Sequence, residues 1–248
     1  MNRLAELARR AQGLVNLLPL RWHLPVRYFV QRATGGLEPE FALLPMLVPR
    51  DRLALDIGAN MGVYSYALAS LAPKVHAFEP QAGCCAVITA WASRSARHVE
   101  VHNAGVGSSR GELVLHVPLI DGKQVGTRAS FTSIDVAHVD VRVPVVTVDS
   151  LQLDPVGFIK IDVEGFEYDV LVGAQRTLQQ DRPALLVELD RNRHERATFD
   201  RVVDLLAGLG YVPHVLRDGR LEACREAPWD MALQYYNFVF LQAGDGPQ

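Results

Sequence analysis

The hydrophobic pattern of the chain changes near residue 50. Residues 1 to about 48 carry apolar positions at helical spacing, interrupted near Pro19, Pro25 and the Gly35-Gly36 pair. After that point, short apolar runs alternate with longer amphipathic segments, which is typical of a mainly parallel β-sheet with helices on its faces. We therefore predict an α/β fold with an N-terminal helical segment at 1–48 and one domain at 49–243.

Seven strands are predicted in the main sheet. The parallel series covers 53–57, 75–78, 99–102, 158–161 and 184–187, with helices at 64–71, 83–94, 167–178 and 198–209. The segments 211–216 and 237–241 form a final antiparallel pair, with a turn at Asp218-Gly219. A further pair, 112–117 and 141–146, flanks a polar loop at 121–133 that we interpret as a lid over the sheet.

Charge and cysteine content narrow the class of protein. The 248 residues carry a formal net charge of −3 and three cysteines, at 84, 85 and 224. A nucleic-acid-binding protein usually has a positive excess, so nucleic acid is not an expected partner. The cysteines match neither a disulfide framework nor a zinc motif and predict reduced thiols in a cytoplasmic protein. No apolar run reaches the length that spans a bilayer.

Residues 2–20 form a basic amphipathic pattern. Arginines at 3, 9 and 10 are interspersed with leucines at 4, 7, 14, 17 and 18 at helical spacing, and the segment lacks the cleavage site of a secretion signal. Two interpretations stay open. The segment is either a helix packed on the domain, or a helix that contacts a membrane surface or a partner protein. The oligomeric state is not readable from the sequence.

A glycine turn follows the first predicted strand. Residues 53–62 read Leu-Ala-Leu-Asp-Ile-Gly-Ala-Asn-Met-Gly, so the strand ends in an acid and leads through two glycines into a helix. This arrangement makes a nucleotide-sized pocket at the carboxyl end of a parallel strand. Glu79 ends the next strand, about 20 residues after Gly58, where an acid binds ribose hydroxyls.

The loop favours S-adenosyl-L-methionine over a nicotinamide dinucleotide. A dinucleotide site has three glycines beside the pyrophosphate, whereas Asn60 replaces the middle one and Asp56 adds a negative charge. That charge repels a pyrophosphate and attracts the ammonium group of a methionine moiety. The expected cofactor contacts are Asp56, Gly58, Asn60, Gly62 and Glu79, with Asn103 and Ala104 at the adenine. A polar turn explains Asn103 equally well.

Acidic residues gather after the fourth and fifth parallel strands. The candidate catalytic residues are Asp162, Glu164, Glu188 and His194. Methyl transfer to a hydroxyl requires removal of its proton by a carboxylate or an imidazole. Alternatively, Asp162 and Glu188 bind Mg²⁺, which acidifies the hydroxyl.

Other charged residues have structural explanations. Lys160 lies inside a strand and predicts an ion pair with a neighbouring acid. Glu167 lies at a helix start, where the helix dipole favours an acid. His98, His102, His116 and His138 show no ligand spacing, so no metal site is predicted from them.

Taken together, these motifs resemble the FkbM family of S-adenosylmethionine-dependent methyltransferases. The matching segments are 55–62, 78–80, 144–149, 159–167, 171–174, 186–188 and 237–240. The block Lys160-Ile-Asp-Val-Glu-Gly165 is the specific part. The resemblance implies a seven-stranded class I methyltransferase fold and O-methylation of a sugar, glycan precursor or polyketide-type metabolite. It carries over the cofactor loop and the acids after the fourth strand as site residues.

Three other functions are consistent with parts of the pattern. One is a Rossmann-type NAD-dependent oxidoreductase, and another is a scaffold that keeps the fold without catalysis. The third is an N-methyltransferase. Enzymes of that class that act on nucleic acids often carry Asn or Asp, two prolines and an aromatic residue after the fourth strand, where this chain reads Asp162-Val-Glu-Gly165.

Overall fold

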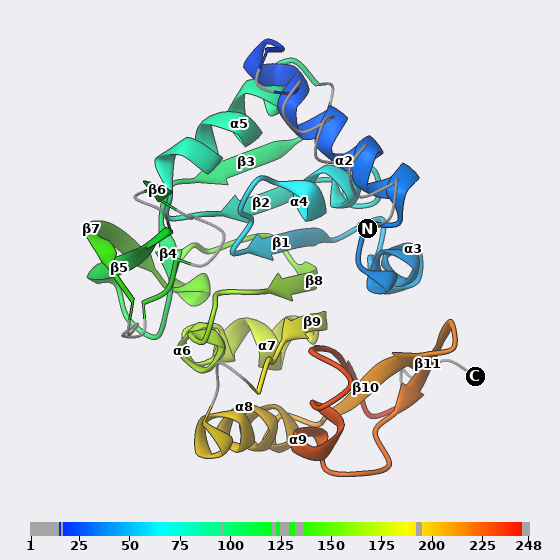
Figure 1. Cartoon of the computed structure of the whole chain (residues 1–248). Helices are drawn as coiled ribbons and strands as arrows, with labels where there is room; N and C mark the ends of the chain where they lie inside the picture. Colours follow the sequence, from blue (N-terminus) through cyan, green and yellow to red (C-terminus); the bar gives the residue numbers. More distant parts are fainter. Residues whose placement is uncertain are drawn as a thin grey trace.

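The computed structural model describes residues 15, 17–95, 97–120, 123–124, 129–131, 136–191 and 195–244. Its centre is an eight-stranded sheet in the order β11-β10-β12-β9-β8-β1-β2-β3 (Figure 1). The parallel strands are β1 (Leu53–Ile57), β2 (Val75–Phe78), β3 (Val99–His102), β8 (Val156–Ile161) and β9 (Ala184–Glu188). The antiparallel end consists of β12 (Asn237–Gln242), β10 (Tyr211–Arg217) and β11 (Arg220–Ala223).

A smaller sheet stands beside the carboxyl ends of the parallel strands (Figure 1). Its order is β4-β7-β5-β6, and its main part is the antiparallel pair of β5 and β7. The bounds are β4 (Gly105–Val106), β5 (Gly111–Ile120), β6 (Lys123–Gln124) and β7 (His138–Val146). Most of the loop interpreted as a lid, 121–133, lies outside the described residues.

Helices cover both faces of the main sheet. On one side lie α2 (His23–Thr34), α3 (Leu44–Leu47), α4 (Val63–Leu68) and α5 (Ala82–Ala92), with the 3₁₀ turns η1 (Leu20–Trp22) and η2 (Pro39–Leu43). On the other lie α6 (Glu167–Val172), α7 (Gln175–Asp181), α8 (Arg196–Gly208) and α9 (Pro228–Met231), with η4 (Val148–Ser150). Every residue of β1 and β8 is therefore buried, as the continuous apolar runs of a two-sided parallel sheet require.

The predicted α/β fold with a mainly parallel sheet and an antiparallel C-terminal strand is confirmed. The sheet has an eighth strand, because the Asp218-Gly219 turn joins β10 to β11 instead of to β12. The predicted helix at 167–178 is two helices. A side chain at Gly173 would bring its Cβ within 2.0 Å of the Gly107 carbonyl oxygen, and this close approach accompanies the break.

The N-terminal segment differs from expectation at Pro25. This proline lies inside α2, in its first turn, where the backbone N–H has no helical partner to lose. Most of the basic segment 2–20 lies outside the described residues. Within the described part of the chain, no helix combines the length and apolar character needed to cross a membrane.

Candidate active site

The order of the strands indicates where a ligand is expected to bind. The chain crosses from β1 to β2 and β3 on one side, and β8 and β9 lie on the other side of β1. Ligands of open α/β sheets bind at the carboxyl ends of the strands at such a reversal. The loop after β1 and the loop after β8 are therefore neighbours at the position where a ligand is expected.

These two loops touch through backbone atoms. Gly58 has φ +80°, and a Cβ there would lie 1.8 Å from the carbonyl oxygen of Asp162. Only glycine combines this left-handed backbone with so close an approach. Asn60, two residues further, also has a positive φ of 48°, which asparagine tolerates better than most residues. The glycine turn is thus shaped by its contact with the β8 loop.

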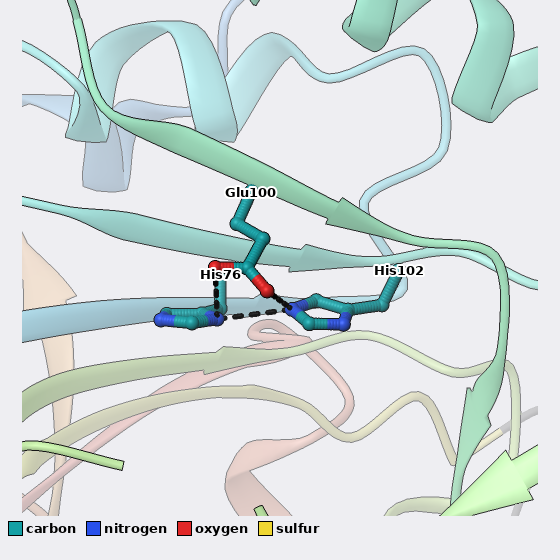
Figure 2. A group of neighbouring side chains, drawn as sticks. All are labelled: His76, Glu100 and His102. Atoms are coloured by element: carbon teal, nitrogen blue, oxygen red, sulfur yellow. Dashed lines mark hydrogen bonds and ion pairs between the residues drawn. The ribbon is translucent and has the colours of Figure 1, made fainter.

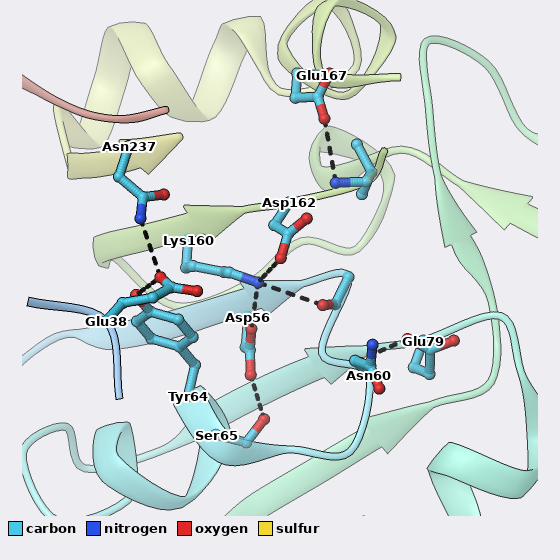
Figure 3. A network of polar contacts seen from close by, with 12 residues as sticks. Glu38, Asp56, Asn60, Tyr64, Ser65, Glu79, Lys160, Asp162, Glu167 and Asn237 are labelled. Carbon is cyan, nitrogen blue, oxygen red and sulfur yellow. Dashed lines mark hydrogen bonds and ion pairs between the residues drawn. The ribbon is translucent and has the colours of Figure 1, made fainter. Parts of the chain in front are cut away.

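Glu79 binds the glycine loop from the end of β2 (Figure 3). The Asn60 N–H donates to its Oε2 atom at 2.7 Å, and the Gln81 N–H donates to Oε1 at 2.9 Å. Burial raises the pKa of this carboxyl group, although the backbone hydrogen bonds oppose that shift. A carboxylate has about four lone-pair sites, so acceptor capacity remains for ligand hydroxyls.

A cavity of about 530 Å³ opens beside Glu79, and we call it the Glu79 cavity. Apolar residues form much of its wall, and Glu79, Asn60, Asp162 and Glu164 supply polar groups. The apolar wall residues include Ile57, Phe78, Ala104, Val106, Leu115 and Phe131. Apolar walls with a few carboxylates suit a nucleoside.

Lys160 is the centre of a buried polar network (Figure 3). Its Nζ atom lies 3.0 Å from Asp162 Oδ2, 4.0 Å from Asp56 Oδ1 and 3.4 Å from the Gly58 carbonyl oxygen. Burial alone lowers the pKa of Lys160, but the two carboxylates outweigh it and raise the pKa above its ordinary value. The predicted ion pair of Lys160 is confirmed, and it ties β1 to β8 below the touching loops.

Asp56 faces Lys160. Its side chain is fully buried, and Oδ2 accepts a hydrogen bond from Ser65 Oγ at 2.5 Å. The residue lines neither the Glu79 cavity nor its neighbour described below. The strand-end position turns the Asp56 side chain toward the interior, where it contacts Lys160 and Ser65. The expected contact with a ligand ammonium stays a prediction.

Glu38 is a site residue that the sequence interpretation missed. Its Oε2 atom accepts hydrogen bonds from the Tyr64 hydroxyl at 2.6 Å and from Asn237 Nδ2 at 3.0 Å. It thus joins the N-terminal segment, α4 and β12 around the Lys160 network (Figure 3). The signal in the sequence is weak: an acid before the proline that begins η2.

A second cavity of about 650 Å³ adjoins the first, and we call it the Lys160 cavity. Gly58, Asn60 and Asp162 line both cavities. The remaining wall of the Lys160 cavity comes from α2, the segment before η2 and the start of α4. Its polar residues are Arg27, Gln31, Glu38, Tyr64 and Lys160. Asp162 therefore lies at the junction of two adjacent cavities.

Other predicted catalytic residues occupy different positions. Glu164 lines the Glu79 cavity with a positive φ of 58°. Glu188 ends β9, where burial and the charge of nearby Asp162 raise its pKa to about 8. Glu167 accepts hydrogen bonds from the N–H groups of Val163 and Gly165, so it orders the turn before α6. His194 lies outside the described residues.

Two predicted cofactor contacts have structural roles. A Cβ at Gly62 would meet Ile88 Cγ1 at 2.7 Å, so this glycine allows α4 to pack against α5. The Asn103 side chain donates to the carbonyl oxygens of Glu79 and Pro80, and it thereby links the ends of β3 and β2. Ala104, in contrast, lines the Glu79 cavity as expected of a residue near an adenine.

Histidines group across strands, which their sequence spacing did not reveal. His76 Nδ1 lies 2.9 Å from His102 Nε2, and Glu100 Oε1 lies 3.6 Å from the same His102 atom (Figure 2). Lys74 forms an ion pair with Glu100 at 2.7 Å. These contacts satisfy the group, so we interpret it as a link between β2 and β3. A second group, His116, His138 and Asp140, lies on β5 and β7.

Comparison with known proteins agrees with this geometry. The family described as "Methyltransferase FkbM domain" matches residues 56–213, which include the glycine loop, Glu79 and Asp162. The chain belongs to the FkbM methyltransferase family. Arg27 and Glu38 precede the matched region, so their contribution to the site is not part of the family match.

Two relatives show the extent of the likeness. The structure of methyltransferase FkbM from Methylobacillus flagellatus KT has a TM-score of 0.52 and 16% identity, covering 93% of this chain and 57% of that protein. The AMB antimetabolite synthetase AmbE from Pseudomonas aeruginosa is 26% identical over 218 residues, which cover 71% of this chain and 10% of the synthetase. This chain thus spans about half of one relative and a tenth of the other.

Proposed function

We propose that this FkbM-family methyltransferase transfers the methyl group of S-adenosyl-L-methionine to a hydroxyl oxygen of a small-molecule or glycan acceptor. The observation that carries the proposal is the position of Asp162 at the junction of the Glu79 and Lys160 cavities. A carboxylate there is within reach of a ligand that spans both spaces and of an acceptor that enters beside it.

The residues of the Glu79 cavity fit the nucleoside part of the cofactor. The Glu79 carboxylate accepts three hydrogen bonds from Asn60 and Gln81, which leaves an acceptor position on Oε2 for a ribose hydroxyl. Phe78, Ala104 and Val106 supply apolar walls for the adenine. Gly58 and Asn60 border both cavities, so the amino-acid end of the cofactor would continue past them toward Lys160 and Arg27.

When bound, S-adenosylmethionine supplies an electrophilic methyl group on a sulfonium. The chain's residues must align the acceptor oxygen with that carbon and take up the hydroxyl proton. We assign the proton to the Asp162 carboxylate, whose Oδ2 atom is fixed by Lys160 at 3.0 Å. The carbon–sulfur bond breaks as the carbon–oxygen bond forms, which leaves S-adenosylhomocysteine and a protonated Asp162.

The expected alternative, Mg²⁺ held by Asp162 and Glu188, does not fit the residues present. The Lys160 ammonium already serves as the cation beside Asp162 Oδ2. Glu188, with its pKa raised to about 8, carries a proton at neutral pH, whereas Mg²⁺ prefers ionised carboxylate oxygens. We derive no step through a metal ion.

Calorimetry with S-adenosylmethionine, S-adenosylhomocysteine and NAD tests the cofactor. We expect binding of the first two and none of NAD. Binding of NAD alone would instead support an oxidoreductase. Incubation of cell extracts with isotopically labelled S-adenosylmethionine then identifies the acceptor by mass spectrometry. Label on nitrogen would replace O-methylation by N-methylation, and cofactor binding without turnover on any hydroxyl compound would support a scaffold.

A further inference from the structure

Arg27 on α2 is a half-buried cation that has no counter-ion among the residues that the structure describes. Its Nε atom is buried and has no hydrogen-bond partner. Among the described residues, no carboxylate lies within ion-pair distance of its guanidinium group. Burial lowers its pKa. Within the described part of the chain the opposing influence is the Cys84 thiol, which does not ionise readily at neutral pH. An arginine nevertheless stays protonated in proteins.

Such an arginine is unfavourable in a protein that binds nothing there. Burying a charged group without a partner is unfavourable, and buried charges in folded proteins are usually paired. The exposed Arg32, on the same helix, has no such constraint. The position of Arg27 is therefore best explained by an anion that binds beside it.

Arg27 faces two spaces next to the glycine loop. It lines the Lys160 cavity, and it also lines a groove of about 1200 Å³ between α5 and the β5–β7 pair. Asn60 and Met61 border both spaces, so the guanidinium group lies beside the tip of the glycine loop. A ligand that leaves the Glu79 cavity along this loop passes Arg27.

The Lys160 cavity has opposite charges among its lining residues. Arg27 supplies an unpaired positive group, whereas Glu38 and Asp162 supply carboxylates. Both carboxylates already have partners, but each keeps lone pairs for a further donor. Such a cavity suits a ligand that carries both an ammonium and a carboxylate, and it also suits an acceptor with one acidic group.

We propose that Arg27 binds the anionic group of a ligand in the Lys160 cavity, a carboxylate or a phosphate, with its charged guanidinium. This proposal rests on the proposed function, which supplies the two molecules that could carry the anion. The anion is either the carboxylate at the amino-acid end of S-adenosylmethionine or an acidic group of the acceptor. In both cases α2, which precedes the region matched by the family, supplies a binding residue.

The test compares two ligands that differ in the amino-acid end. S-adenosylhomocysteine has the carboxylate, and 5′-methylthioadenosine lacks the whole amino-acid end. If the cofactor is the source, Arg27→Met lowers the affinity for S-adenosylhomocysteine by about 10- to 100-fold and leaves that for 5′-methylthioadenosine unchanged. Arg27→Lys keeps part of the affinity, because it retains the charge. Arg32→Met is the matched control and changes neither affinity.

The acceptor, as the second source of the anion, is tested by measuring the binding of inorganic phosphate to protein saturated with S-adenosylhomocysteine. If the acceptor supplies the anion, the wild-type complex binds phosphate and the Arg27→Met complex does not, while the nucleoside affinities stay equal. The proposal is overturned if Arg27→Met changes neither kind of binding, or lowers the affinity for both nucleosides equally. If the wild-type chain binds neither nucleoside, the proposed function fails, and phosphate binding that depends on Arg27 would still support the anion site.

Discussion

The two oxygens of Asp162 have different surroundings. Oδ2 lies 3.0 Å from the Lys160 ammonium. Among the described residues, no side chain donates a hydrogen bond to Oδ1, and the Asp162 side chain is 25% exposed. One oxygen therefore fixes the orientation of the carboxylate, and the other is available to a reacting hydroxyl. The division of roles explains why a residue held in an ion pair can still accept a proton.

From this arrangement we predict that Asp162→Asn binds S-adenosylhomocysteine with nearly unchanged affinity but loses about 10²- to 10⁴-fold in kcat, the usual contribution of a positioned base. The amide keeps the shape and cannot take the proton. Calorimetry and methyl-transfer rates measure the two effects. Asp51→Asn, at an exposed position before β1, is the control. A fully active Asp162→Asn enzyme would remove this residue from the mechanism.

The raised pKa of Glu188 predicts how the stability of the protein depends on pH. Its pKa is raised to about 8, so the folded protein holds a proton that the unfolded chain releases near pH 4.5. Between these values the folded state binds more protons, and stability falls as the pH rises, by up to about 1.4 kcal/mol per pH unit. We expect Glu188→Gln to be less sensitive than the wild type between pH 5.5 and 8 in urea unfolding.

The matched control for that experiment is Glu195→Gln at an exposed position. It replaces the same chemical group at an exposed site, so it should keep the wild-type dependence of stability on pH. Parallel curves for the wild type and Glu188→Gln would show that Glu188 ionises normally in the folded protein.

At the scale of elements, the contact between the β1 and β8 loops depends on Gly58. Its positive φ and the 1.8 Å approach that a Cβ would make to the Asp162 carbonyl leave no room for a side chain. We expect Gly58→Ala to lower the free energy of unfolding by several kcal/mol and to weaken nucleoside binding. Chemical denaturation and calorimetry measure the two effects.

Gly83 provides the opposite case in the same experiment. It lies in the first turn of α5, and a Cβ there meets nothing within 4 Å. Gly83→Ala should therefore be neutral or stabilise the protein by up to about 1 kcal/mol, because alanine favours helix more than glycine does. Equal destabilisation by both substitutions would contradict the role given to the loop contact.

The strands were predictable from local pattern, and their partners less so. Short apolar runs identified β1, β2, β8 and β9 closely, because buried parallel strands have few polar positions. The edge strand β3, which is only partly buried, was identified by alternating valines and polar residues. The Asp218-Gly219 turn was found, but the strand it leads to was not, since β12 pairs with β10 and β9 from further along the chain. Local signals identify a turn and do not identify a distant pairing.

The same distinction applies to the site. Glu79 and Asp162 were predictable because both follow parallel strands, and those strand ends share one edge of the sheet. The direction of the Asp56 side chain was not predictable, because it depends on Lys160 of the neighbouring strand β8. Arg27 and Glu38 come from a segment without a motif, and only the packing of that segment brings them to the cavities.

At the scale of the whole molecule, the site joins parts that are distant in sequence. Glu38 contacts Asn237 of β12, and α2 packs against α4 and α5. The β5–β7 pair contributes Leu115 to the Glu79 cavity. A ligand in both cavities would therefore contact the N-terminal segment, the glycine loop, the β8 loop and the smaller sheet at once.

Such a ligand should stabilise these parts together. At 100 times its Kd, S-adenosylhomocysteine should raise the free energy of unfolding by about 2.7 kcal/mol, because it binds only the folded state. Amide hydrogen exchange should slow at 58–62, 79–81, 104–106 and 162–165, and stay unchanged in the β10–β11 hairpin, which lies at the far edge of the sheet. NAD at the same concentration serves as the control. Slower exchange in the hairpin alone would place the ligand elsewhere, because no residue of β10 or β11 lines either cavity.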